Sequence, residues 1–214
     1  MYDLDRLARK WQQYRTDRSI NLASEKISKH QNIDARVEMI GERVFGLLVS
    51  AYTKPDRHYH NLNHIDRVLS TIERFSDLHN PISVYLAVWF HDFVYDPQSS
   101  DNEAQSAKSA QDLLTNLGES IATIERVQQL IMATQGHQIN PTDDGDGCVF
   151  LDADLAILGA DPVGYQAYQR SIRREYSWVS DAASQTGRLQ VLESFLQRDL
   201  SYYTALLFNE LESI

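Results

Sequence analysis

The stretch Val84-Tyr85-Leu86-Ala87-Val88-Trp89-Phe90-His91-Asp92 decides the fold, because a long apolar run leads directly into two ionisable residues. A run of this kind predicts a buried helix. Ionisable side chains at the end of such a helix are costly unless they are paired or bound to a metal ion. A helix-terminal histidine followed by a capping aspartate is the alternative interpretation of the same dipeptide.

The same helical character extends over most of the chain. Apolar residues recur at steps of three and four, and five prolines and nine glycines are few for 214 residues. We therefore predict an all-α bundle. Its expected helices cover residues 3–17, 33–53, 62–78, 82–94, 101–117, 119–135, 148–158, 161–179, 181–199 and 201–212. Residues 137–147 (HQINPTDDGDG) form the clearly irregular loop, because turn-forming residues are packed together there.

These helices are expected to form a single domain over residues 1–214. In this prediction an N-terminal helix and linker cover residues 1–30, the core covers 31–200, and a C-terminal helix covers 201–214. The large aromatic residues of the apolar segments are predicted to lie in the core. They are Trp89, Phe90, Phe150, Trp178, Phe195 and Phe208.

Composition narrows the class of protein. No apolar stretch approaches the roughly 18 residues of a membrane span, and the start is polar, so we expect a cytoplasmic protein without a membrane partner. Cys148 is the only cysteine, which excludes an internal disulfide and a cysteine-based zinc site. The formal net charge of -10 argues against binding to a nucleic-acid backbone. A small phosphorylated substrate is compatible with that net charge, because bound cations can reverse the sign of the charge in an acidic cleft. A homodimer is also compatible with the sequence.

Two histidines lie four residues apart in Tyr59-His60-Asn61-Leu62-Asn63-His64. On one helix their side chains would share a face, with β-carbons about 6 Å apart, which is the spacing by which paired histidines hold zinc. Asn61 is a good N-cap, however, so that His60 can instead precede the helix and face the site from a turn. An exposed pair of helical histidines is the plainer alternative.

Two further carboxylates, Asp152 and Asp154, lie within another apolar segment. A spacing of two places them on different faces of a helix, so we expect one to face the site and the other to cap or form hydrogen bonds. The residues alone leave open which of the two does which. Together, the histidines and carboxylates of the chain form a ligand set that suits Mg, Mn, Fe, Co or Zn.

These motifs resemble the HD superfamily of metal-dependent phosphohydrolases, over roughly residues 40–200. The resemblance implies a helical bundle with a metal site between central helices, which holds one or two divalent ions. It implies the ligands His64, His91, Asp92 and Asp154, and thereby prefers Asp154 to Asp152. The implied activity is hydrolysis of a small, nucleotide-like phosphate ester by a metal-activated water.

The element Tyr59-His60-Asn61-Leu62-Asn63-His64 is also similar to the Tyr-His-Asn-x-x-His element of cyclic-nucleotide phosphodiesterases. That likeness implies that His60 is the general acid. The doublet is followed here by Phe93-Val94-Tyr95 rather than by Asp-His-Pro, so a cyclic-nucleotide pocket is not supported. Alarmone hydrolases carry Glu-Asp where this chain has Tyr95-Asp96, which leaves the substrate open.

Further roles are assigned to polar residues near the motifs. Asp92 is expected to bridge to a second ion with the help of His137 or Asp96, and Glu103 to orient the attacking water. Arg57 is a candidate phosphate clamp, because its planar guanidinium matches phosphate oxygens. Thr134 and His137 are candidates for substrate binding. Arg173, Arg174, Glu175 and Tyr176 form another polar cluster, for which an exposed helix face is the preferred interpretation.

Two other functions remain open. Some HD-type proteins are di-iron oxygenases that use extra histidines, and His60 and His137 could fill those places. A metal-stabilised module that binds or senses a nucleotide without turnover is the non-catalytic alternative.

Overall fold

A computed structural model describes residues 2–23, 31–142, 144–198 and 200–212 of the chain, and it is all-α over these residues, with no strand. The predicted fold class is confirmed. The chain divides into two compact units, each built from two separate stretches: residues 1–54 with 79–136, and residues 55–78 with 137–214. The predicted single domain over residues 1–214 stays a prediction. None of the described helices has the length and the apolar run needed to cross a membrane.

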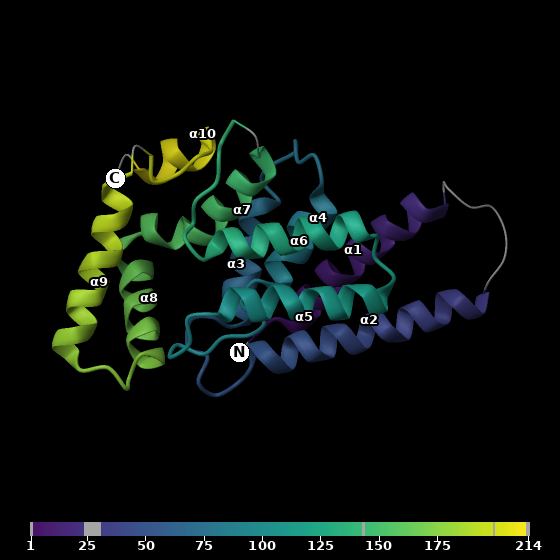
Figure 1. The fold of residues 1–214 in the computed structure, drawn as a ribbon, viewed down its shortest axis with the longest axis horizontal. Coiled ribbons are helices and arrows are strands. Elements are labelled where there is room, and N and C mark those ends of the chain that lie inside the picture. The colour runs from purple at the N-terminus through teal and green to yellow at the C-terminus, as the bar shows by residue number, and fades with distance from the viewer. Residues whose placement is uncertain (1, 24–30, 143, 199, 213–214) are drawn as a thin grey trace. The chain divides into compact units, whose positions relative to one another are not determined.

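The first unit is a bundle of longer helices. They are α1 (Leu4–Ala23), α2 (Gln31–Tyr52), α4 (Pro81–Phe90), α5 (Asn102–Leu117) and α6 (Ile121–Thr134). Helix α6 packs along α5 and against α4, and Figure 1 shows α5 and α6 side by side. The side chain of Asn80 accepts a hydrogen bond from the Ser83 amide and caps α4 at its Asn80-Pro81 start.

An aromatic cluster anchors α4 in the first unit. The Trp89 ring meets the Trp11 ring of α1 edge to face at 5.7 Å and the Phe45 ring of α2 at 5.8 Å. Trp11 is 1% exposed and donates its indole N–H to the Gly41 carbonyl oxygen at 3.1 Å. The Tyr52 hydroxyl donates to the Trp89 carbonyl oxygen at 3.0 Å. These contacts fix α4 just before the His-Asp dipeptide at its end.

The second unit is built from shorter helices. They are α3 (Leu62–Ile72), α7 (Gly145–Leu155), the 3-10 helix η1 (Ala156–Gly159), α8 (Pro162–Glu175), α9 (Asp181–Leu196), α10 (Ala205–Leu207) and the π-helical turn η2 (Phe208–Glu212). Helix α3 packs against α7. Leu155, Tyr202 and Leu207 form a small apolar core around which η1, α10 and η2 gather.

Asp152 connects α7 to the C-terminal segment of the second unit. Its side chain is completely buried, and its two carboxylate oxygens accept the amide N–H groups of Tyr203 at 2.9 Å and Thr204 at 2.6 Å. These bonds satisfy backbone donors directly before α10. Asp152 therefore has the hydrogen-bonding role that we predicted for one of the two aspartates.

Five helices are shorter than predicted. The expected helices at 62–78, 82–94, 161–179 and 181–199 end at Ile72, Phe90, Glu175 and Leu196. The segment 201–212 contains only the short turns α10 and η2. Trp178 consequently lies in a turn beyond α8 and is 56% exposed, so its predicted core position was wrong. Trp89, Phe90 and Phe150 are confirmed as core, and Phe195 and Phe208 are partly buried. Residues 24–30 of the predicted linker lie outside the described residues.

The role of Asp152 gives a first prediction. Replacement of Asp152 by Asn removes one of two buried acceptors for backbone N–H groups, and we expect a loss of about 1–3 kcal/mol in the free energy of unfolding. Urea unfolding followed by circular dichroism measures it. Asp112→Asn, an exposed change on α5, is the matched control, and an equal effect of both variants would contradict the assigned role.

Candidate metal and acid–base site

The capping of α3 sets the positions of the first two histidines. Asn61 is the N-cap of α3, and its side chain accepts the Asn63 amide N–H at 2.9 Å. His60 therefore precedes the helix, as the N-cap interpretation predicted, while His64 lies in the first turn of α3. His64 is 2% exposed, whereas His60 is half-buried, so the two rings have different surroundings.

Asp154 of α7 brings together two histidines of the second unit. Its Oδ1 lies 3.1 Å from Nε2 of His64, and its Oδ2 lies 2.9 Å from Nε2 of His137. Asp152, two residues earlier, points to the C-terminal segment instead. The structure thus separates the two aspartates: Asp154 faces the histidines, and Asp152 binds backbone. The metal-ligand role that the resemblance implies for Asp154 stays a prediction.

His137 is held in an uncommon backbone conformation. Its φ angle is 48°, the one positive value among the described non-glycine residues. Its carbonyl oxygen accepts Arg198 Nη1 at 2.8 Å and the Tyr203 hydroxyl at 3.4 Å. A left-handed histidine costs conformational energy and persists only where the surroundings determine it, which is common at functional sites. These contacts hold the His137 ring beside Asp154.

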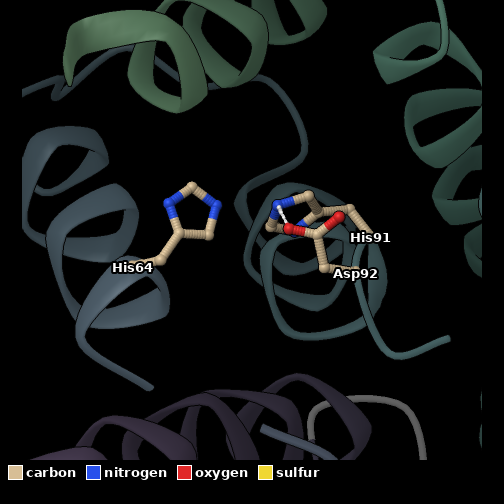
Figure 2. Close-up of side chains that lie close together, drawn as sticks. All are labelled: His64, His91 and Asp92. Carbon is tan, nitrogen blue, oxygen red and sulfur yellow. Dashed lines mark ion pairs between the residues drawn. The ribbon is translucent and has the colours of Figure 1, made fainter. Parts of the chain in front are cut away.

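His91 and Asp92 lie at the C-terminal end of α4 in the first unit. His91 is the C-cap of α4 and is 2% exposed, and its amide N–H donates to the Ala87 carbonyl oxygen. Its Nδ1 lies 2.9 Å from the Val88 carbonyl oxygen, and its Nε2 lies 3.0 Å from Oδ2 of Asp92. Figure 2 draws His91 and Asp92 with this ion pair, together with His64.

The hydrogen bond to Val88 determines which nitrogen of His91 faces Asp92. A carbonyl oxygen only accepts, so Nδ1 must carry a hydrogen, and in a neutral ring Nε2 then presents a lone pair. That lone pair meets a carboxylate oxygen 3.0 Å away. Two acceptors at this distance need a cation, either a proton on Nε2 or a metal ion bound by both. A ring N–H donated to a backbone carbonyl is also the usual arrangement of metal-binding histidines.

Glu175 is the partner of His60. One carboxylate oxygen of Glu175 accepts the amide N–H groups of Tyr59 at 2.7 Å and His60 at 3.0 Å. The other lies 2.7 Å from Nδ1 of His60. The Glu175 side chain is completely buried, while the His60 side chain is 19% exposed. A buried carboxylate thus holds both the backbone and the ring of the predicted general acid.

The ionisation of Glu175 follows from these contacts. Burial alone would raise the pKa of its carboxyl group, but the hydrogen bond and charge of His60 and the amides of Tyr59 and His60 lower the pKa below its ordinary value of 4.5. Glu175 is therefore a carboxylate at neutral pH. Its negative charge favours a hydrogen on Nδ1 of His60, so that Nε2 is the ring nitrogen that does not contact Glu175.

The other residues predicted to belong to the site differ in their burial and in their hydrogen bonds. Arg57 is 4% exposed and donates to the His60 carbonyl oxygen at 3.1 Å, so it supports the turn that carries His60. Thr134 is buried at the end of α6 and donates back to the Ile131 carbonyl oxygen. Asp96 is exposed in a turn and accepts the Gln98 amide, and Glu103 is half-buried in the first turn of α5. Their assigned roles stay predictions.

Sequence reasoning missed Glu175, because it assigned the polar cluster at residues 173–176 to an exposed helix face. Glu175 is 6% exposed, so that interpretation was wrong for this residue. A signal was present in the sequence, since Ile172 and Glu175 are three residues apart and share a side of α8. Burial and the nearby charges of Asp152 and Asp144 raise the pKa of the Cys148 thiol to about 11, so Cys148 is a thiol rather than a thiolate at neutral pH.

Comparison of the chain with protein-family models, with curated proteins and with solved structures finds no match. The resemblance to the HD superfamily therefore stays a prediction from the motifs.

The contacts of Glu175 predict a pH-dependent effect on stability. Glu175→Gln removes the buried charge that binds His60, and we expect a loss of about 1–3 kcal/mol at pH 7. Because the pKa of Glu175 is lowered in the folded state, its stabilising contribution is present above pH 4.5 and is lost as the pH falls through the folded-state pKa. The difference between wild type and variant should therefore shrink in acid.

Urea unfolding at pH 7 and below pH 4.5 measures this difference. Glu193→Gln, an exposed change on α9, is the control and should have little effect at either pH. A wild-type advantage that is independent of pH would contradict the assigned ionisation of Glu175.

Proposed function

We propose that this chain is a metal-dependent phosphohydrolase of the HD type, which hydrolyses a small, nucleotide-like phosphate ester. His64, His91, Asp92 and Asp154 are the proposed ligands of a divalent metal ion. His60 is the proposed general acid, and Glu175 is its positioning residue. The observation that carries the proposal is His91, whose Nδ1 is committed to a carbonyl oxygen while its Nε2 faces the carboxylate of Asp92.

The donor chemistry supports a metal. His91 and Asp92 of the first unit, and His64 and Asp154 of the second, each offer a nitrogen or oxygen atom that a divalent ion accepts. Two neutral histidines with two carboxylates carry two negative charges, which a divalent cation balances. Without a metal ion, each buried histidine nitrogen that faces a carboxylate would have to carry a hydrogen atom. The set therefore fits a divalent ion that accepts both nitrogen and oxygen ligands.

A divalent ion bound by these residues would lower the pKa of a water molecule to near neutrality and offset charge on the phosphate ester. The carboxylates of Asp92 and Asp154 orient the histidines: Asp154 lies against the ring nitrogens of His64 and His137, and Asp92 against that of His91. Rings held in this way need little rearrangement to bind a cation, so less of the binding energy is spent on ordering them.

His60 is suited to proton transfer by the way it is held. Its Nδ1–H donates to Glu175, so its Nε2 is the nitrogen that would meet a leaving-group oxygen. When both nitrogens are protonated, the carboxylate of Glu175 offsets the positive charge of the ring. Transfer of the Nε2 proton to the departing oxygen then returns His60 to the tautomer that Glu175 already favours.

Metal content tests the first part of the proposal. We expect the purified protein to contain a divalent metal, and a His91→Ala, Asp92→Ala double variant to lose both the metal and phosphatase activity. Elemental analysis by mass spectrometry and a phosphatase screen measure the two quantities. An Asp77→Ala, His79→Ala variant removes an exposed pair of the same residue types and should retain both.

A double variant of His91 and Asp92 that keeps its metal and activity would falsify the proposed site. Iron as the bound metal, together with oxygen consumption during turnover, would instead favour an oxygenase.

The role of His60 has its own readout, because a general acid matters most for poor leaving groups. His60→Ala should retain the metal and lose roughly 10²- to 10⁴-fold in kcat with an alkyl phosphate ester. The loss should be much smaller with a p-nitrophenyl ester, whose leaving group needs no proton. Equal losses with both esters would show that His60 does not protonate the leaving group.

A further inference from the structure

Arg188 of α9 is held between two tyrosines of α8. Its Nη1 donates to the Tyr168 hydroxyl at 2.9 Å, and its Nη2 donates to the Tyr165 hydroxyl at 2.8 Å. The centre of the guanidinium group lies 4.9 Å from the Tyr168 ring centroid and 5.6 Å from the Tyr165 ring centroid. Figure 1 shows α8 and α9 side by side in the second unit.

The charge of Arg188 is not balanced by a carboxylate in the described part of the chain. This is unusual in a protein with 30 acidic and 20 basic residues. Arg173, also on α8, pairs with Asp181 at 2.6 Å. The Nε atom of Arg188 is buried and has no hydrogen-bond partner among the described residues. A half-buried cation without a counter-charge is costly, and a bound anion would offset that cost.

The two hydroxyls point to the kind of ligand. Each accepts a hydrogen bond from Arg188, so each keeps its own proton for donation. Neither hydroxyl donates that proton to a described residue. Burial raises the pKa of Tyr168, so its hydroxyl stays protonated at neutral pH. Two O–H donors polarised by a guanidinium group form a receptor for an oxyanion.

Within the second unit, the two tyrosines lie near His60 and His64 of the proposed site. The Tyr168 ring meets the Tyr59 ring at 4.6 Å between centroids. The Tyr59 ring in turn lies 4.9 Å from the His60 ring and 5.0 Å from the His64 ring. One aromatic side chain thus separates the two hydroxyls from the proposed acid and a proposed metal ligand.

We propose that Tyr165 and Tyr168, held by Arg188, bind a second phosphate group of the substrate, one that is not hydrolysed. The preferred substrates would then be phosphate esters with a second phosphate group. The identification of the ligand as substrate rests on the proposed function, whereas the anion-binding site stands on its own contacts.

Inorganic phosphate is the probe for this site. We expect it to raise the thermal unfolding midpoint of the full chain, at an ionic strength kept constant with chloride, more than acetate does. Tyr165→Phe and Tyr168→Phe keep both rings and remove only the hydroxyls. Each should weaken phosphate binding about tenfold, because each removes one hydrogen bond to a charged group.

Matched controls distinguish this site from other sources of binding. Tyr176→Phe removes a hydroxyl for which no hydrogen bond is found in the described residues, and it should bind phosphate like wild type. Arg188→Lys keeps the charge but cannot hold both hydroxyls, and it should bind more weakly. Circular dichroism and the unfolding midpoint without phosphate confirm that each variant folds.

Two results would overturn the proposal: a wild type that phosphate stabilises no more than acetate does, or a Tyr165→Phe, Tyr168→Phe double variant that responds to phosphate like wild type. Phosphate bound at the metal contributes equally to wild type and variants, so the difference between them reports on the tyrosines alone.

Turnover then separates this proposal from the proposed function. The double variant should raise KM about a hundredfold for a nucleoside 3′,5′-bisphosphate and leave KM unchanged for the 5′-monophosphate, with kcat similar for both. Phosphate binding that depends on the tyrosines, without hydrolysis of any ester, would refute the proposed function and leave the anion site standing. Hydrolysis in which the double variant changes KM equally for both substrates would refute the anion site and leave the proposed function standing.

Discussion

The hydrogen bond between the His91 ring and the Val88 carbonyl oxygen is the constraint on which the candidate site depends. It uses a carbonyl group in the last turn of α4, and so it joins the end of the helix to the orientation of the ring. Because Trp89 is fixed by Trp11 and Phe45, the aromatic core of the first unit also fixes this ring. The position of Nε2 of His91 is thus a product of core packing.

In the second unit, the positions of the backbone and side chains are fixed in a different way. Short helices have little packing surface, and buried carboxylates take over much of the positioning. Asp152 holds the C-terminal segment through two backbone amides, and Glu175 holds the turn at Tyr59 and His60 through two more. Charged acceptors form stronger hydrogen bonds than neutral ones, and they are well suited to fixing irregular backbone.

Much of the helix pattern could be predicted from the sequence, because apolar periodicity and turn residues are local signals. The N-cap role of Asn61, the buried helix before His91 and the irregular loop around residue 140 are examples. Glu175 could not be placed, since it contacts His60 across 115 residues, and no local pattern encodes such a pairing. The prediction for Trp178 was wrong for a related reason, because the burial of Trp178 depends on where α8 ends. The different surroundings of Asp152 and Asp154 could not be predicted from their spacing, because they depend on contacts with distant residues.

Glu175 has one further consequence, for the divergence of related chains. A single carboxylate supports the backbone of a turn and the ring of His60, so the fold and the reactivity of this turn cannot drift independently. A related chain without a histidine at position 60 would leave a buried charge at position 175 without its main side-chain partner. We therefore expect the two positions to change together over evolutionary time.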